Sequence, residues 1–307
     1  MSPNRDCVET TPLLRNLGEP TNGCHLNNSN LVDLDGPNDP LNPQNLPQWR
    51  KWLCAITLGA MTFAVTFASA VFSAVTVEVA REFEVAPEVI ALATSLFVFG
   101  FAMGPIVMGP ASEAYGRKLP LFLGYLAFVF CQIPVATAQN VRTILIYRLL
   151  GGMASSGSPA IVGGYMADFL RPVERGVAIS IFVATTMIGP CVGSIVGSIV
   201  LQSSLGWRWT AWISLILGFV FGLIGWVALP ETYVPVLLKK KAQRLRLQTG
   251  NWALHSKSEE SPVGIKDFTT RYITRPFVML SQEPILVLMT LYVSFSFGMV
   301  YFLLVVS

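Results

Sequence analysis

The chain has 307 residues, of which 52% are hydrophobic and only 13% are charged. Soluble domains carry about 25% charged residues, so this composition argues against an ordinary soluble protein and indicates a protein of the membrane. The net charge of +3 indicates little by itself, and the distribution of the charges along the chain is more informative.

Residues 1–48 are rich in Asn, Pro, Asp and Gly. No charged stretch in this part leads directly into an apolar one, which argues against a signal peptide. A polar composition of this kind favours disorder, so we interpret residues 1–48 as a disordered tail that precedes the membrane segments.

Seven segments without Asp, Glu, Lys or Arg follow this tail. Each has roughly the 20 residues that a helix needs to cross about 30 Å of hydrocarbon, and none alternates as the strands of a barrel do. Only helices or closed barrels satisfy the backbone hydrogen bonds inside lipid. The sequence therefore predicts an all-α membrane protein with seven spanning helices. The segments are 53–77, 89–112, 119–141, 149–167, 176–207, 209–230 and 284–307.

The basic residues are concentrated in alternate connections between these segments. Lys and Arg accumulate on the cytoplasmic side of membrane proteins. The tail and the long connection after the sixth segment are therefore predicted to lie in the cytoplasm. The basic residues that set this orientation are Arg50, Lys51, Arg117, Lys118, Arg171, Arg175 and nine further Lys or Arg residues from 239 to 275.

The first six segments are joined by short connections, so we treat residues 49–230 as one transmembrane unit with antiparallel neighbours. Gly116-Arg117-Lys118 follows the second segment, and the similar Gly206-Trp207-Arg208 follows the fifth. In the predicted orientation these turns lie on opposite faces of the membrane. That arrangement is typical of two groups of three helices related by an inverted repeat.

Residues 231–283 form a cytoplasmic basic linker before the seventh span at 284–307. Four leucines of the linker can share one face of a helix whose other face is basic, which favours a helix on the anionic inner leaflet. A solvated run of charges that only fixes the topology is the equal alternative. The leucines are Leu237, Leu238, Leu245 and Leu247.

The stretch GPASEAYGRKLP, residues 109–120, places three charges between two apolar segments. Glycine permits a positive φ angle or a close backbone approach, and Glu113 is near enough to Arg117 in sequence to pair with it. A cytoplasmic loop with glycine turns and topogenic charges is the simpler alternative. The spacing resembles the signature loop of the major facilitator superfamily, which more often has Asp at the position of Glu113. The resemblance implies that Gly109, Glu113, Gly116, Arg117 and Lys118 form a cytoplasmic gate that latches two halves of a transporter.

The fourth segment is preceded by Arg148, a basic residue that extends an apolar run. An arginine here either snorkels to the outer interface or lies buried beside a cavity, where it acts on a proton or a substrate. The run resembles the fourth-helix motif of the same superfamily, an arginine followed by a face of small residues. This resemblance implies a coupling role for Arg148 and for Gly152.

The fifth segment contains MIGPCVGSIVGSIV, in which Gly189, Gly193 and Gly197 recur every four residues and share one helix face. Small residues at this period allow helices to pack closely, and ordinary packing would explain them. Together with Pro190, however, they resemble the antiporter motif GPxxG of superfamily members that exchange a drug for a proton. This resemblance favours export over uptake.

Four further stretches resemble the fungal twelve-helix drug:proton antiporters, a branch that includes polyamine, cycloheximide and multidrug exporters and pumps of secondary-metabolite clusters. The resemblance implies the major facilitator fold, with residues 49–230 as its amino-terminal six-helix half. Because the family has twelve helices and the sequence ends in the seventh, we expect a chain truncated after its seventh helix. The stretches are NPQNLPQWRKW, GWRWTAWI, LPETYVPVLLKKKAQRLRLQTGN and RPFVMLSQEPILVLMTLYVSFSFGMVYF.

The resemblance implies proton-coupled efflux of a small amphipathic drug, toxin or secondary metabolite by alternating access. The expected partners are this small molecule, protons and the lipid bilayer, and the expected location is the plasma membrane, with the vacuolar membrane as the alternative. A transport-inactive fragment, an uptake transporter of the same fold and a seven-helix receptor are the other interpretations. The GPxxG motif argues against uptake, and the cytoplasmic amino terminus argues against a receptor.

An enzymatic function has no support in the sequence. There is no P-loop, and the two histidines lie far apart in polar segments. The five cysteines are scattered, and we interpret them as small apolar residues rather than as a disulfide framework or a metal site. We expect no cofactor, metal or nucleic-acid partner. Glu78, at the outer end of the first segment, is either a proton acceptor or a rim residue. Five phenylalanines offer apolar surface to a substrate or to lipid, namely Phe63, Phe67, Phe97, Phe99 and Phe101.

Overall fold

The computed structural model describes residues 31–33, 39, 41–256, 278 and 281–306. These residues form helices and short connections, with one isolated β-bridge between Leu31 and His255 and no strand in the ranges described. The predicted disordered tail lies outside the described residues except for 31–33, 39 and 41–48, where Pro43–Asn45 form the 3-10 turn η1. Residues 257–277 of the predicted linker also lie outside them.

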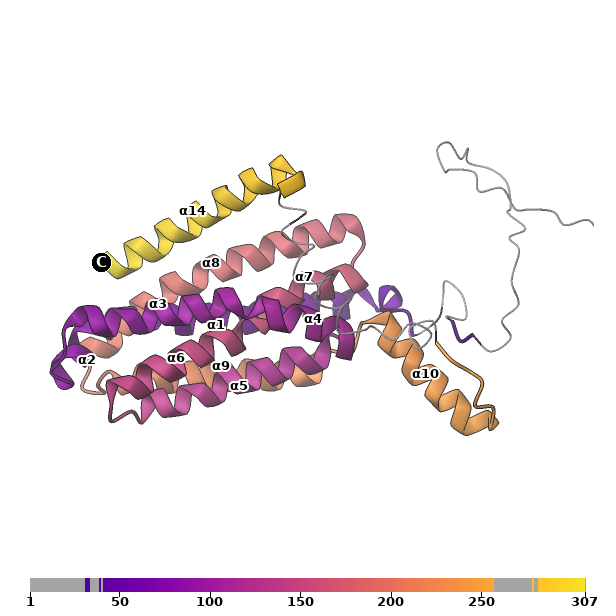
Figure 1. Ribbon diagram of the computed structural model, residues 1–307, viewed down its shortest axis with the longest axis horizontal. Helices are drawn as coiled ribbons and strands as arrows, with labels where there is room; N and C mark the ends of the chain where they lie inside the picture. Colours follow the sequence, from indigo (N-terminus) through magenta and orange to yellow (C-terminus); the bar gives the residue numbers. More distant parts are fainter. Residues whose placement is uncertain (1–30, 34–38, 40, 257–277, 279–280, 307) are drawn as a thin grey trace, which may run out of the picture.

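The membrane helices run side by side along the long axis of the molecule (Figure 1). In chain order the elements are α1 (Gln48–Val71), η2 (Ser73–Val75), α2 (Thr76–Glu82), α3 (Pro87–Met103), α4 (Pro105–Tyr115), α5 (Lys118–Ala136), α6 (Val141–Ser155), α7 (Gly157–Phe169), α8 (Pro172–Gln202), α9 (Arg208–Ala228), α10 (Val234–Thr249) and α14 (Pro284–Val306).

Six stretches among the described residues are long and apolar enough to cross a membrane. They overlap the predicted first, second, third, fifth, sixth and seventh segments, so the reading of the charge-free runs is confirmed for these six. Their bounds are Gln48–Glu82, Pro87–Tyr115, Lys118–Ala136, Pro172–Gln202, Arg208–Ala228 and Pro284–Leu303.

The predicted fourth span, 149–167, differs from the other six. A turn at Ser156 divides it into α6 and α7, and neither helix alone has the length of a membrane span. Pro159 has no N–H to donate to the carbonyl of Ser155, which explains a break at this place. The two helices still follow one another along the bundle (Figure 1), so together they take the place of one span.

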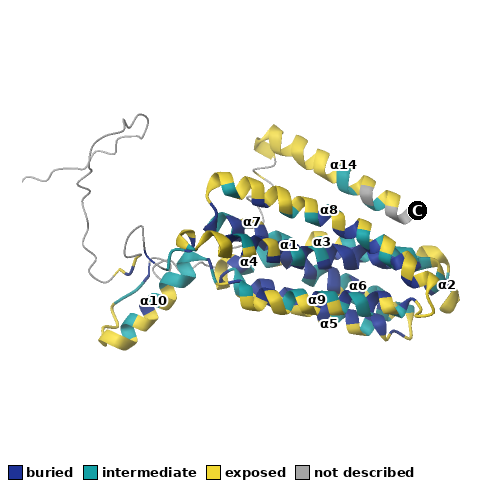
Figure 2. Cartoon of the chain, turned by 180° about the vertical axis from the view of Figure 1, so that it is seen from behind, coloured by how far each residue is buried: buried dark blue, intermediate teal, exposed yellow. Residues whose placement is uncertain are grey.

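Helix α1 lies at the centre of the bundle, where it packs against α8 and α9, while α6 packs against α3 and α5. Leu58, Met61 and Val65 of α1 are fully buried in the main core. Figure 2 shows exposed residues along α8 and α14, in contrast to the buried α1. Because α8 and α14 are apolar as well as exposed, their outer faces are suited to lipid.

Two similar turns lie at opposite ends of the bundle. Gly116 before α5 and Gly206 before α9 both have positive φ angles, of 92° and 81°. The residues after Gly206 contact the ends of α2 and α5, whereas those after Gly116 contact the chain beyond α9. This arrangement agrees with the inverted repeat expected from the sequence.

Helix α10 leaves the bundle at the end where α4 and α7 lie (Figure 1). Its Lys241 pairs with Asp39 at 3.4 Å, and residues 31 and 32 meet His255 beyond the helix. Of the four predicted interfacial leucines, Leu247 is 78% exposed and the other three are half-buried. The basic helix is therefore present, and its contact with the inner leaflet stays a prediction.

Candidate functional site

The turn between α4 and α5 is organised around the carboxylate of Glu231, which follows α9. Oε1 accepts the backbone N–H of Arg117 at 3.0 Å, and Oε2 accepts that of Lys118 at 3.1 Å. The same carboxylate accepts the N–H groups of Thr232 and Tyr233. A negative charge at the amino-terminal end of a helix is favourable, because the first N–H groups of the helix lack partners within it. Glu231 therefore ties the start of α5 to the start of the linker.

Arg117 extends this network to α7 and α4. Its Nε lies 3.2 Å from Oδ2 of Asp168, and its Nη1 donates to the hydroxyl of Ser112 at 3.1 Å. The guanidinium also lies over the ring of Tyr233, 5.0 Å from its centroid. The pairing of Arg117 with Glu113 stays a prediction. Glu113 is exposed on α4, and Asp168 lies in the last turn of α7.

The side chain of Lys118 contacts α9, whereas Gly109 has no close neighbour among the described residues. Lys118 Nζ donates to the carbonyl of Trp226 at 3.1 Å and lies 5.0 Å from the centroid of that ring. Around Gly109 no neighbouring atom of the described residues lies within 4 Å of where a Cβ would be. The structure thus joins Gly116, Arg117 and Lys118 in one network and leaves Gly109 facing open space.

Sequence reasoning missed three residues of this network: Asp168, Glu231 and Tyr165, whose hydroxyl donates to the carbonyl of Pro230. A usable signal exists for the two acids. Asp168 directly follows the uncharged run 149–167, and Glu231 directly follows the run 209–230. In the predicted orientation both acids lie at the cytoplasmic ends of their spans, where they are natural partners for a basic loop.

Arg148 lies in the interior of the bundle, 2% exposed. Its Nη1 donates to the carbonyl of Ala68 at 2.8 Å, and its guanidinium lies 4.1 Å from the ring centroid of Phe72 and 5.5 Å from that of Phe97. Its Nε has no partner in the described chain. The side chain does not reach the surface, so the snorkelling alternative is wrong. Gly152, one turn further, has no room for a side chain because a Cβ would overlap the carbonyl of Phe97.

The three glycines of the fifth span pack α8 against α1. A Cβ on Gly189 would overlap Oγ1 of Thr66, one on Gly193 would lie 2.8 Å from the carbonyl of Phe67, and one on Gly197 would lie 2.6 Å from that of Val71. Pro190 is buried in the same interface. The close-packing interpretation is confirmed, and the antiporter role of the motif stays a prediction.

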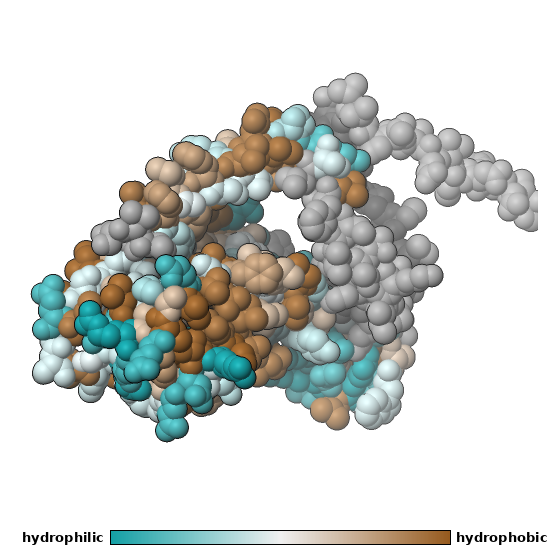
Figure 3. Space-filling model, turned by 60° about the vertical axis from the view of Figure 1, so that its left-hand side comes forward, coloured by the Kyte–Doolittle hydropathy of each residue, from teal (hydrophilic) through white to brown (hydrophobic). Residues whose placement is uncertain are grey.

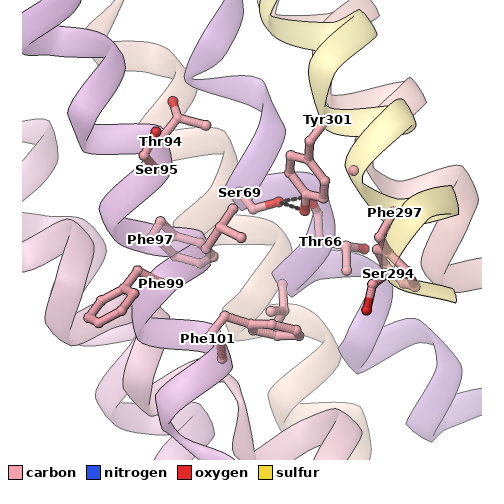
Figure 4. Close-up of a pocket in the computed structure, with 14 residues that line it drawn as sticks. Thr66, Ser69, Thr94, Ser95, Phe97, Phe99, Phe101, Ser294, Phe297 and Tyr301 are labelled. Carbon is pink, nitrogen blue, oxygen red and sulfur yellow. Dashed lines mark hydrogen bonds between the residues drawn. The ribbon is translucent and has the colours of Figure 1, made fainter. Parts of the chain in front are cut away.

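A cavity of about 680 Å³ lies between α1, α3 and α14. Figure 3 shows a hollow between the segment at the top of the view and the body of the molecule, and Figure 4 shows residues that line the cavity. Phe97, Phe99 and Phe101 of the five predicted phenylalanines belong to its wall, together with hydroxyl-bearing residues such as Thr66. A hydrogen bond of 2.7 Å between Ser69 and Tyr301 joins α1 to α14 beside the cavity.

The family assignment comes from comparison with known proteins. The family model of the Major Facilitator Superfamily matches residues 57–307. The chain belongs to this superfamily. It is 49% identical over 271 residues to the citrinin biosynthesis cluster MFS transporter mrr1 of Monascus ruber, covering 88% of this chain and 54% of that protein. For the ascochitine biosynthesis cluster MFS transporter of Didymella fabae the identity is 47%, with 88% of this chain and 52% of that protein covered.

A third relative of this superfamily member is the cercosporin MFS transporter CTB4 of Cercospora nicotianae, 48% identical over 88% of this chain and 53% of that protein. The chain thus spans about half the length of these relatives. The inward-open structure of the xylose transporter XylE from E. coli matches with a TM-score of 0.52 at 21% identity, covering 65% of this chain and 53% of XylE. This structural likeness shows the fold alone. Transporter-named relatives and the superfamily indicate a transport protein rather than an enzyme.

Proposed function

We propose that this chain takes part in proton-coupled export of small amphipathic molecules, above all toxic secondary metabolites, by alternating access. The cavity between α1, α3 and α14 is the observation that carries the proposal. Its volume of about 680 Å³ lies within the 300–1,000 Å³ typical of small-molecule sites. A wall of phenylalanines and hydroxyl groups suits a molecule with an apolar body and a few polar atoms.

The relatives support the direction of transport and the class of substrate. Three of them carry the names of toxins or of the clusters that make them: citrinin, ascochitine and cercosporin. A producing cell benefits from removing such compounds, which favours the plasma membrane as the location, with the vacuolar membrane as the alternative. The GPxxG stretch that begins at Gly189 supports proton exchange through its resemblance to the antiporter motif.

The contacts of α14 support alternating access. Its described residues meet the rest of the chain mainly at α8 and η2, and the Ser69–Tyr301 bond lies near the carboxyl ends of both α1 and α14. With the amino terminus in the cytoplasm, that end faces outward. We therefore assign the Ser69–Tyr301 contact to an outer gate. We assign the network of Glu231, Arg117 and Asp168 to the cytoplasmic side of the six-helix half.

We propose that Glu78 is a rim residue and not the proton carrier. Glu78 forms an exposed ion pair with Arg81 at 3.4 Å, a surface arrangement that suits the rim of the protein. Arg148 is a buried charged group that lies against Phe97 of the cavity wall. We propose that it acts in coupling, either on the substrate or on a proton site outside the described residues.

Export is tested by expressing the chain in a drug-sensitive yeast and measuring cellular accumulation of labelled citrinin and cercosporin. We expect lower accumulation than with the empty vector, and we expect a protonophore to abolish the difference. Arg148→Gln should raise accumulation to the vector level, whereas Arg142→Gln, which changes an exposed arginine of the same helix, should not.

A second candidate is a chain without transport activity of its own, and the chain spans about half the length of these relatives. Unchanged accumulation of both compounds, with the chain detected in the membrane, would support this candidate over export. The same result with a panel of chemically different toxins would remove the export proposal altogether.

A further inference from the structure

Arg148 brings a positive charge into the bundle that no acid of the described chain balances. Its hydrogen-bond acceptor is a backbone carbonyl, the rings of Phe72 and Phe97 lie beside it, and its Nε has no partner among the described residues. A buried charge without a counter-ion is unfavourable, and the site therefore favours an incoming negative charge. In a region of low dielectric the field of such a charge reaches farther than it does in water.

This charge lies directly behind the wall of the cavity. Phe97 contacts the guanidinium and also lines the cavity, and Ala68, the acceptor of Arg148, precedes the lining residue Ser69. In Figure 4 Phe97 of α3 points toward Ser69 of α1. Arg148 thus contacts both Phe97 of α3 and the backbone next to Ser69 of α1. A ligand that lies against these two residues would be attracted or repelled by the charge of Arg148.

Thr94 gives a second and independent indication of a ligand at this place. It lies on α3 one turn before Phe97, is 4% exposed and lines the cavity. Its hydroxyl has no hydrogen-bond partner in the described chain. A buried hydroxyl without a partner is costly, so it is available to donate to an acceptor in the cavity.

The remaining wall is aromatic and uncharged. Phe99, Phe101 and Phe297 line the cavity, and none of the lining residues is acidic or basic. Aromatic rings would pack against a flat apolar body, while the Thr94 side of the wall would receive its polar end.

On the basis of the proposed function, we infer that the cavity selects aromatic organic anions. The aromatic body lies among the phenylalanines, and a carboxylate or acidic phenolate faces Thr94 with Arg148 behind it. Neutral compounds of the same shape bind more weakly, and cationic ones are repelled. The preference of the cavity for an anion does not depend on the direction of transport.

The inference is tested by binding to the intact 307-residue chain in lipid nanodiscs, measured by isothermal titration calorimetry near neutral pH. The probes are 2-naphthoate, its neutral isostere 2-naphthamide and the cation 2-naphthylmethylammonium. We expect 2-naphthoate to bind about tenfold more tightly than 2-naphthamide, as for a hydrogen bond to a charged group, and the cation to bind most weakly. Equal affinities, or no saturable binding of 2-naphthoate, would overturn the inference.

Variants separate the two features of the site. Arg148→Gln should bring the ratio of the two affinities close to one, and Arg148→Lys should keep the preference for the anion. Thr94→Val, which is nearly isosteric, should weaken 2-naphthoate several-fold. The matched control is Ser95→Ala, because Ser95 also lines the cavity but donates to the carbonyl of Ala91.

Folding and transport are read separately from charge selection. Far-ultraviolet circular dichroism and the melting temperature identify a variant that fails to fold. If Arg148→Gln fails to fold, the binding of the probes to Thr94→Val tests the inference instead. A preference for the anion that survives in folded Arg148→Gln would contradict the inference. If yeast expressing the chain still exclude toxins while the three probes bind equally, the inference fails and export stands.

Discussion

The Cβ position of Gly116 lies 2.7 Å from Oε2 of Glu231, so the turn before α5 closes around a residue without a side chain. Its φ of 92° and ψ of 170° belong to a region of conformational space that essentially only glycine occupies. The carboxylate needs this approach, because two of the N–H groups that it accepts follow immediately, at Arg117 and Lys118.

Gly116→Ala is therefore expected to destabilise the chain by about 1–3 kcal/mol from backbone strain, in addition to displacing the Glu231 carboxylate. The measurement is the melting temperature of the purified protein in detergent. Gly163→Ala is the control, since Gly163 is an exposed helical glycine with no atom within 4 Å of its Cβ position. Equal melting temperatures of the two variants would contradict the assigned turn geometry.

Gly109→Ala should behave in the opposite way, although Gly109 belongs to the same sequence motif. No atom of the described chain lies near its Cβ position, and alanine is the better helix former. We expect unchanged or slightly higher stability. If export falls in the yeast accumulation assay while stability is kept, Gly109 acts through a partner beyond this half. A large loss of stability would show that its surroundings have been assigned wrongly.

Glu231→Gln keeps the size of the side chain and removes one of the two acceptors. The amide nitrogen then faces an N–H group that had been bound by an oxygen, and a part-buried donor loses its partner. We expect a loss of about 1–3 kcal/mol in unfolding free energy, as for an unsatisfied buried group. Denaturation of the variant is compared with that of Glu88→Gln, an exposed acid at the start of α3; similar effects of both would sink this prediction.

The membrane segments could be predicted because the thickness of the bilayer fixes the length of an uncharged run. Even the break between α6 and α7 had a signal in Pro159, which was overlooked because the run of uncharged residues continues across it. Gly189, Gly193 and Gly197 were likewise placed on one face by their spacing alone, and that face packs on α1.

The partners of the loop between α4 and α5 could not be predicted in the same way. Arg117 lies 51 residues from Asp168 and 114 residues from Glu231, so their contacts depend on how whole helices assemble. Local spacing pointed only to Glu113, four residues before Arg117. The burial of Arg148 was equally undecided, since a position near the end of a span allows both snorkelling and an inward rotamer. Which one occurs depends on the face that α6 turns toward α1 and α3.

Gly189 connects the glycine motif with the cavity through Thr66. Thr66 lines the cavity on one side of α1, and its Oγ1 occupies the space that a Cβ on Gly189 would need. We expect Gly189→Ala to lower the melting temperature and to weaken 2-naphthoate binding, because the hydroxyl must move. Thr66→Ala in the same chain should restore a large part of the stability, a non-additive effect of about 0.5–3 kcal/mol for residues in contact. Additive losses from the two substitutions would exclude this direct contact.

The hydrogen bond between Ser69 and Tyr301 predicts the behaviour of α14. Its length of 2.7 Å and its place near the carboxyl ends of both helices mean that removing it should loosen α14 from α1. A hydrogen bond of about 1 kcal/mol corresponds to roughly a fivefold shift between a closed and an open arrangement. The distance between spin labels on Val77 and Leu303, both exposed, reports this shift by double electron–electron resonance in a chain whose cysteines are replaced by alanine.

Tyr301→Phe should move the distribution of this distance to longer values, and Ser69→Ala should do the same. Because either substitution breaks the same bond, the double variant should add little to the single ones. Tyr292→Phe is the matched control, since Tyr292 is 69% exposed on the same helix. A distribution that stays unchanged in Tyr301→Phe would show that other contacts hold the carboxyl end of α14, namely those with α8 and η2.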